Sequence, residues 1–205
     1  MKIQELFIKL KMDDKRNNFL LDFFRANFFF ENYSLFIGSI LAKSSDSQID
    51  RILSNTRPVH YAKIMSVSAF FEYEKTIENH GYELTKVFRS TVIEKHLKEK
   101  YSNDNIIVNI KKIKNKKSQE IELFLIESDL NNEELEKENL LLRHFAIESK
   151  EPLIDSLQEA LLLNKFNNVG GGNNKEEKST ILYYEKYFGE NQLIRLELFK
   201  KDGND

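Results

Sequence analysis

The chain repeats one order of apolar runs, and each copy carries a histidine and a glutamate at the same two places. In the first half, His60 lies near the start of VHYAKIMSV and Glu122 lies inside QEIELFLIES. In the second half, His144 lies near the start of RHFAIES and Glu197 lies inside LIRLELFKK. This recurrence predicts two copies of one structural unit. Four side chains at equivalent places in two such copies can converge on the axis between them.

The order of predicted elements supports the repeat. Residues 58–128 predict β-α-β-(α)-β-β, and residues 142–200 predict β-α-β-β-β. We therefore expect an α+β fold of two βαβββ modules, preceded by an N-terminal helical segment. The expected divisions are the helical segment at 1–56, the first module at 57–128, a linker at 129–141 and the second module at 142–205.

Several stretches carry more specific expectations. LLLRHFAIES, from Leu140, predicts a strand, FNNV is a weak strand, and GGGNNKEEKS, from Gly170, is expected to be a flexible loop. The basic run KKIKNKK, from Lys111, is interpreted as a solvated hairpin turn in preference to a phosphate contact. The N-terminal helix has more aromatic surface than one packing stripe needs, so we expect it to be buried on the outer face of the sheet or in a homodimer.

Composition excludes several classes of function. The net charge of −2 gives no bias toward nucleic acid or an anionic membrane surface. Because the chain has no cysteine, disulfides, thiolate metal sites and cysteine nucleophiles are excluded. The N-terminus lacks a signal-peptide core, and no apolar run reaches the length of a membrane span. We expect a soluble cytoplasmic protein with a small-molecule substrate and neither a nucleic-acid nor a membrane partner.

The four repeated residues are the candidate site. A charged residue inside an apolar strand is costly to bury unless it is paired or bound to a metal. A single strand histidine or glutamate is more often structural, but two imidazoles and two carboxylates at matched places suit a divalent metal ion. Strand alternation leaves Glu120 as an alternative to Glu122. By the same alternation, the expected substrate-facing residues are Arg195, Glu148, Phe124 and Phe199.

At these residues the chain resembles the vicinal oxygen chelate superfamily, the group of glyoxalases and extradiol dioxygenases. The resemblance covers roughly residues 58–200 and implies that the sheets of the paired modules curve into a cup around a metal. It implies one divalent ion per site, such as Fe, Ni, Zn or Mn, with metal ligands His60, Glu122, His144 and Glu197. The TVIEKHLKEKY segment and the N-terminal helices lie outside the minimal family unit.

The resemblance leaves the reaction open. A glyoxalase-type lyase or isomerase would use Glu122 as ligand or catalytic base, whereas a dioxygenase triad would need only His60, His144 and Glu197. The superfamily also includes metal-free proteins that bind and sequester small toxic molecules. We therefore expect a metal-dependent enzyme, keep the metal-free binding protein as the alternative, and allow for a homodimer.

Overall fold

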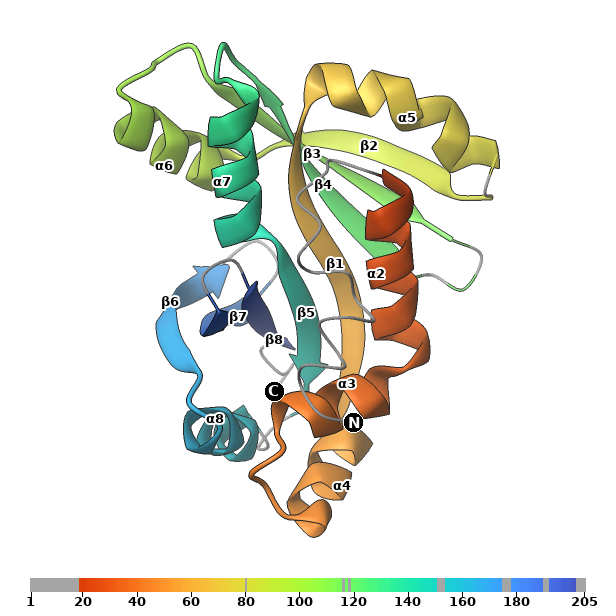
Figure 1. Ribbon diagram of the computed structural model, residues 1–205, viewed down its shortest axis with the longest axis vertical. Coiled ribbons are helices and arrows are strands. Elements are labelled where there is room, and N and C mark those ends of the chain that lie inside the picture. Colours follow the sequence, from red (N-terminus) through yellow and green to blue (C-terminus); the bar gives the residue numbers. More distant parts are fainter. Residues whose placement is uncertain are drawn as a thin grey trace. The chain divides into compact units, whose positions relative to one another are not determined.

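The computed structural model describes residues 19–79, 81–115, 117, 119–150, 154–174, 178–189 and 192–201 (Figure 1). The chain divides into two compact units at Val59/His60 and Arg143/His144. Unit 1 combines the residues up to Val59 with those from His144 onward, and unit 2 comprises the residues between them.

Unit 2 is a βαβββ module with one additional helix inside it and another at its end. Its elements are β1 (Thr56–Ser66, from His60), α5 (Val67–Asn79), β2 (Glu83–Arg89), α6 (Thr91–Tyr101), β3 (Ile107–Lys114), β4 (Glu120–Glu127) and α7 (Asn132–Leu142). The strand order is β2-β3-β4-β1, in which β1 and β4 are parallel and the other pairs are antiparallel.

Unit 1 contains the N-terminal helices and a second βαβββ module. Its elements are α2 (Phe19–Glu31), α3 (Tyr33–Ile40), α4 (Asp46–Asn55), β5 (His144–Ser149), α8 (Ile154–Leu163), β6 (Asn167–Asn174), β7 (Ser179–Gly189) and β8 (Gln192–Lys201). The order β5-β8-β7-β6 again pairs the first and last strands in parallel. Both modules therefore share one topology, which confirms the predicted fold class.

In unit 2 the sheet face that carries His60 and Glu122 has an apolar end and a polar end. The apolar end belongs to a buried cluster in which Ala62, Ile64 and Phe124 pack with residues of α6 and α7. Helix α7 is also tied to β1, because Asn139 Oδ1 accepts a hydrogen bond from the Ile64 amide at 3.1 Å. Helix α5 lies on the other side of the sheet (Figure 1). The two additional helices therefore cover one end of this face and leave the polar end for the site.

The phenylalanine-rich N-terminal helices pack on the outer face of the sheet of unit 1. Phe29 of α2 and Phe36 of α3 are fully buried, and their ring centroids lie 5.1 and 4.9 Å from that of Phe145 on β5. Because side chains alternate along a strand, Phe145 points to the face opposite His144. Phe29 and Phe36 are buried on the outer face as expected, whereas Phe24 of the same surface is 43% exposed.

A helix occupies most of the predicted linker. Helix α7 is closed at its start by a capping box, in which Asn131 and Glu134 each bind the other's backbone amide. The helix continues to Leu142, so the expectation that Leu140–Leu142 belong to a strand was wrong, and β5 begins only at His144. The apolar side of this helix packs in one buried cluster with α6 and with residues of β1, β3 and β4.

The predicted glycine loop also differs from the structure. Gly170, Gly171 and Gly172 form part of strand β6 and pair with β7, after an irregularity between Asn168 and Gly170. Glycine weakens a strand, but pairing with the long strand β7 outweighs this local preference. Among the described residues, no helix combines the length and apolar character that crossing a bilayer requires.

Candidate metal centre

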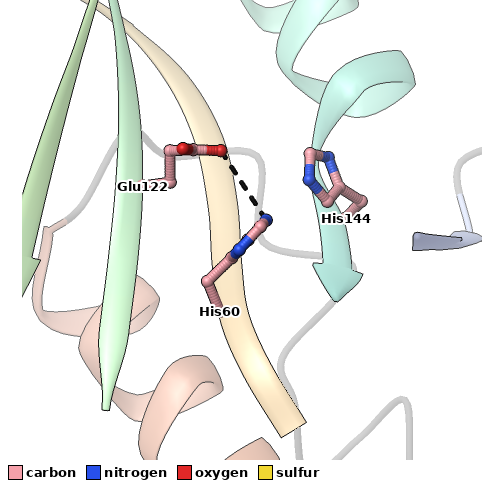
Figure 2. Close-up of side chains that lie close together, drawn as sticks. All are labelled: His60, Glu122 and His144. Carbon is pink, nitrogen blue, oxygen red and sulfur yellow. Dashed lines mark ion pairs between the residues drawn. The ribbon is translucent and has the colours of Figure 1, made fainter. Parts of the chain in front are cut away.

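His60 and Glu122 form a buried pair on neighbouring parallel strands of unit 2. The register places Ala62 opposite Glu122, so His60 lies two residues before the position opposite the glutamate. Both side chains point to the same face, because His60 and Ala62 have the same parity along β1. His60 Nε2 lies 3.6 Å from Glu122 Oε2, and the two side chains are 10% and 11% exposed (Figure 2).

His144 and Glu197 form the same kind of pair in unit 1. Ala146 lies opposite Glu197 on the parallel strands β5 and β8, and His144 again lies two residues before that alanine. His144 Nε2 is 3.1 Å from Glu197 Oε2, with 6% and 7% of the two side chains exposed. Figure 2 labels His144 at its position on β5. Each module therefore holds a histidine–glutamate pair in an identical sheet register.

The equivalence extends to neighbouring positions on the same faces. Phe124 and Phe199 each follow the repeated glutamate by two residues. The third strand of each module places Lys112 opposite Glu122 in unit 2 and Tyr183 opposite Glu197 in unit 1. One register step away, unit 2 has Lys114 opposite Glu120, whereas unit 1 has Glu185 opposite Arg195. The signs of this second pair are reversed between the modules.

The structure separates the roles of the two glutamates on β4. Lys112 Nζ lies 3.1 Å from Glu120 Oε1 and 3.4 Å from Glu122 Oε1, and Lys114 Nζ lies 3.1 Å from Glu120 Oε2. Glu120 is therefore engaged by two lysines, and Glu122 is the carboxylate beside His60. Of the two alternatives left by strand alternation, Glu122 has the geometry of a ligand.

Electrostatic coupling favours the charged forms of Lys112 and Glu120. Burial alone would lower the pKa of Lys112, but the carboxylates of Glu122 and Glu120 outweigh it and raise that pKa. Burial would likewise raise the pKa of Glu120, but Lys112 and Lys114, with a smaller contribution from His60, lower it. The polar end of the face in unit 2 is therefore an alternating chain of ammonium and carboxylate groups.

In unit 1 the environment of the pair is aromatic. The Tyr183 ring meets the His144 ring edge-on, with centroids 5.8 Å apart and planes at 75°. Arg195 Cζ lies 5.6 Å from the Tyr183 ring centroid, and an Arg195 Nη atom lies 3.8 Å from Glu185. Arg195, a predicted substrate-facing residue, thus reaches the ring that supports His144.

The other predicted substrate-facing residues have different surroundings. Glu148 forms an ion pair with Arg57, and both line a cleft of about 320 Å³ with Ser54, Asn55, Thr56 and Lys150. Phe124 lies in the buried cluster under α6 and α7. Phe199 is half-buried beside Ile181 of β7. That each of these residues contacts a substrate stays a prediction.

Sequence reasoning missed Lys112 and Tyr183. Lys112 lies in the basic run interpreted as a solvated turn, but it is part of strand β3 and contacts both glutamates. The signal was the hairpin itself: antiparallel pairing of 107–114 with 120–127 fixes Lys112 opposite Glu122. The equivalent pairing of β7 with β8 fixes Tyr183 opposite Glu197.

No protein-family model matches the chain, and no curated protein matches it either. Solved structures similar to it include a hypothetical protein from Bacillus halodurans C-125, with a TM-score of 0.46 and 11% identity over 73% of this chain and 97% of that one. A glyoxalase I mutant from Zea mays has a TM-score of 0.42 and 15% identity over 72% of this chain and 43% of its own. A methylmalonyl-CoA epimerase from Streptomyces coelicolor has a TM-score of 0.42 and 11% identity over 74% of this chain and 98% of its own. This glyoxalase I and this epimerase belong to the vicinal oxygen chelate superfamily, which is the superfamily that the sequence resembles.

Proposed function

We propose that the chain binds one divalent metal ion through its two histidine–glutamate pairs and acts on adjacent oxygens of a small metabolite. One observation carries the proposal: a buried pair of the same composition recurs in the same sheet register in both modules. A single buried pair is an ordinary structural feature. Two equivalent pairs have a common explanation if their donors serve one ion.

The separations of the donor atoms support this reading. Two ligand atoms that each lie about 2.1 Å from one ion are roughly 3.0–3.4 Å apart in tetrahedral or octahedral geometry. The Nε2–Oε2 separations of 3.6 Å in unit 2 and 3.1 Å in unit 1 are close to this range. The separation in unit 2 exceeds a normal hydrogen bond, whereas the separation in unit 1 also fits a direct hydrogen bond.

The donor set also fits a divalent ion chemically. Imidazole nitrogen and carboxylate oxygen suit Zn, Fe, Ni and Mn, and the chain has no thiolate that would select a softer ion. His60, His144 and Glu197 would hold the ion, with Glu122 as the fourth ligand or as the base. A bound ion would supply Lewis-acid polarisation of the substrate oxygens.

The chain's own residues would perform the proton transfer and the positioning. Glu122 has one oxygen directed to His60 and the other to Lys112, so it is held in place to take up or return a proton. Tyr183 packs against the His144 ring and fixes its orientation. Arg195, which lies over the ring of the same tyrosine and pairs with Glu185, would bind an anionic substituent of the substrate.

Elemental analysis of the purified protein tests the proposal. Protein prepared without chelator is expected to contain close to one divalent ion per chain, and His144→Ala is expected to lose most of it without unfolding. His96→Ala, at an exposed position on α6, is the matched control. Metal content that is unchanged in both His60→Ala and His144→Ala would refute the site.

Glu122→Gln separates the two reaction classes. A lyase or isomerase that uses this carboxylate as base or ligand would lose most of its turnover. A dioxygenase that relies on His60, His144 and Glu197 would tolerate the change and would consume oxygen with its substrate. Oxygen uptake that is absent with catechols and oxo-acids, together with a Glu122-dependent isomerisation, would exclude the dioxygenase.

A metal-free binding protein is the second candidate. The observation that favours it is the contact between Lys112 and Glu122, because an ammonium already neutralises that carboxylate. In this case the histidines and glutamates would hydrogen-bond a small ligand. Ligand binding that persists unchanged after exhaustive chelation, in protein that takes up no divalent ion, would select this candidate over the metalloenzyme.

A further inference from the structure

A polar cleft opens in unit 1 where helix α4 passes into β1. Its volume is about 320 Å³, which is the size of a site for a small molecule. Six residues of unit 1 line it, and all six are polar or charged: Ser54, Asn55, Thr56, Arg57, Glu148 and Lys150. Sites for small molecules are usually lined mainly by apolar side chains. A cleft with this lining therefore selects a polar ligand.

The uncharged side chains of the lining are used inside the molecule. Ser54, Asn55 and Thr56 each donate a side-chain hydrogen bond to the carbonyl of the fourth residue before them, at 2.8, 2.9 and 2.8 Å. The Lys150 amide donates to the Asn55 carbonyl at 3.1 Å. These bonds satisfy carbonyls at the end of α4, where the helix dipole would otherwise disfavour an anion. The charged side chains are therefore the groups that the cleft offers to a ligand.

Glu148 fixes the orientation of the Arg57 guanidinium. Arg57 Nε donates to Glu148 Oε2, and the arginine side chain is 71% exposed whereas the glutamate is 16% exposed. Because this contact uses Nε, both Nη groups remain available. Within the described parts of the chain, neither these groups nor the exposed Lys150 ammonium has a hydrogen-bonded or ion-paired partner. A guanidinium fork held in this way matches two oxygens of a carboxylate or phosphate.

The balance of charge in the cleft also favours an anion. Two lining residues, Arg57 and Lys150, are cations, and Glu148 is the single carboxylate among the six. That carboxylate is already neutralised by Arg57. An anion would compensate the remaining positive charge, whereas a cationic ligand would have to displace the arginine from its partner.

We propose that this cleft binds the carboxylate or phosphate group of a small polar molecule, with Arg57 and Lys150 as the binding cations and Glu148 as the residue that positions Arg57. Glu148 then acts through the arginine and does not contact the ligand itself. It lies four residues after His144 on β5, which is roughly 13 Å along the strand. Binding in the cleft therefore requires neither the metal ion nor the proposed function.

Titration of the full chain, freed of metal by chelation, tests the proposal. Amide shifts in ¹H–¹⁵N spectra are followed while inorganic phosphate, and in a separate series malonate, is added at constant ionic strength set with sodium chloride. Saturable shifts are expected at the amides of residues 54–57 and 148–150. The same titration of His144→Ala should give the same affinity, because the imidazole takes no part in this site.

Variants of the two cations separate a built site from a general effect of charge. Arg57→Gln should weaken binding about tenfold, as expected for the loss of hydrogen bonds from a charged group, and Lys150→Gln should weaken it less. Arg57→Lys retains the charge but loses the fork, so it should resemble Arg57→Gln. Arg51→Gln is the matched control, since it removes the same charge from an exposed position on α4 outside the lining. Its affinity should be unchanged.

Two variants of Glu148 test its positioning role. Glu148→Ala removes the acceptor of the Arg57 Nε bond and should weaken anion binding, although it also removes a negative charge. Glu148→Gln still offers an oxygen to Nε and should retain the affinity. If the carboxylate acted by charge alone, both variants would bind the anion more tightly. Thermal unfolding of each variant confirms that the fold is preserved.

The outcomes distinguish this site from the metal centre. Saturation with phosphate alone, or with malonate alone, identifies which of the two groups the cleft accepts. Shifts that grow without saturating for both anions, or an equal effect of Arg57→Gln and Arg51→Gln, would overturn the proposal. Tighter binding by Glu148→Ala would overturn the positioning role. Saturable anion binding by a protein that takes up no divalent ion would support the cleft while refuting the proposed function.

Discussion

Replacing Phe36 with alanine should destabilise the whole of unit 1, because this ring joins the N-terminal helices to the sheet. Its side chain is fully buried, and its centroid lies 5.1 Å from Phe29 and 4.9 Å from Phe145. Burial of a phenylalanine contributes about 1.5–3 kcal/mol of transfer free energy. Each aromatic pair adds roughly 0.5–1.5 kcal/mol, and with the cavity left behind the expected loss is about 3–5 kcal/mol.

Denaturant unfolding followed by circular dichroism and tyrosine fluorescence measures this loss. Phe24→Ala is the matched control in the same segment, because the side chain is 43% exposed, and it should cost about 0.5 kcal/mol or less. A cycle that combines Phe36→Leu with Phe145→Leu should show a coupling of roughly 0.5–1.5 kcal/mol. A loss below about 1 kcal/mol for Phe36→Ala, or a separate early transition of the helices, would refute this reasoning.

Two further predictions concern backbone geometry and pH. Gly171→Ala should destabilise the protein by about 1–3 kcal/mol in a thermal unfolding assay, because a Cβ would lie 2.2 Å from the Ile181 carbonyl oxygen. Gly172→Ala should be tolerated in the same assay, because the space around Gly172 is open. Hydrogen bonds from Arg89, and then Lys98, lower the pKa of Glu94 to about 2 from its usual 4.5. The stability that ionised Glu94 contributes should therefore be complete above pH 4.5 and should be lost as the pH falls toward 2. Glu94→Gln should flatten the fall of the unfolding free energy across this pH interval.

The strands that carry the candidate ligands could be predicted because their sequences alternate clearly and are rich in β-forming residues. The parallel pairing of β1 with β4 and of β5 with β8 then placed both histidine–glutamate pairs as the repeat suggested. Helix α7 was less visible because its composition is acidic and polar, although Asn131 and Glu134 already spell a capping box. Its apolar partners come from α6 and from strands β1, β3 and β4, which no local pattern can reveal.

The remaining differences have the same physical origin. Glycines at 170–172 favour a loop locally, yet pairing with β7 holds them in a strand. Lys112 belongs to a run of basic residues that is typical of a solvated turn, and only the hairpin register places it beside Glu122. Local propensity therefore predicted most of the elements but missed α7 and the glycine part of β6, whereas contacts between strands decided the surroundings of the site.

Titration of metal-free protein with Co²⁺ tests most directly whether the two pairs serve one ion. The visible absorption of bound Co²⁺ reports its coordination, and the account predicts saturation at one equivalent per chain. His60→Ala and His144→Ala should each abolish the same absorption band, although the two residues belong to different modules. Saturation at two equivalents, or a band that depends on one histidine and is indifferent to the other, would contradict a single shared metal centre.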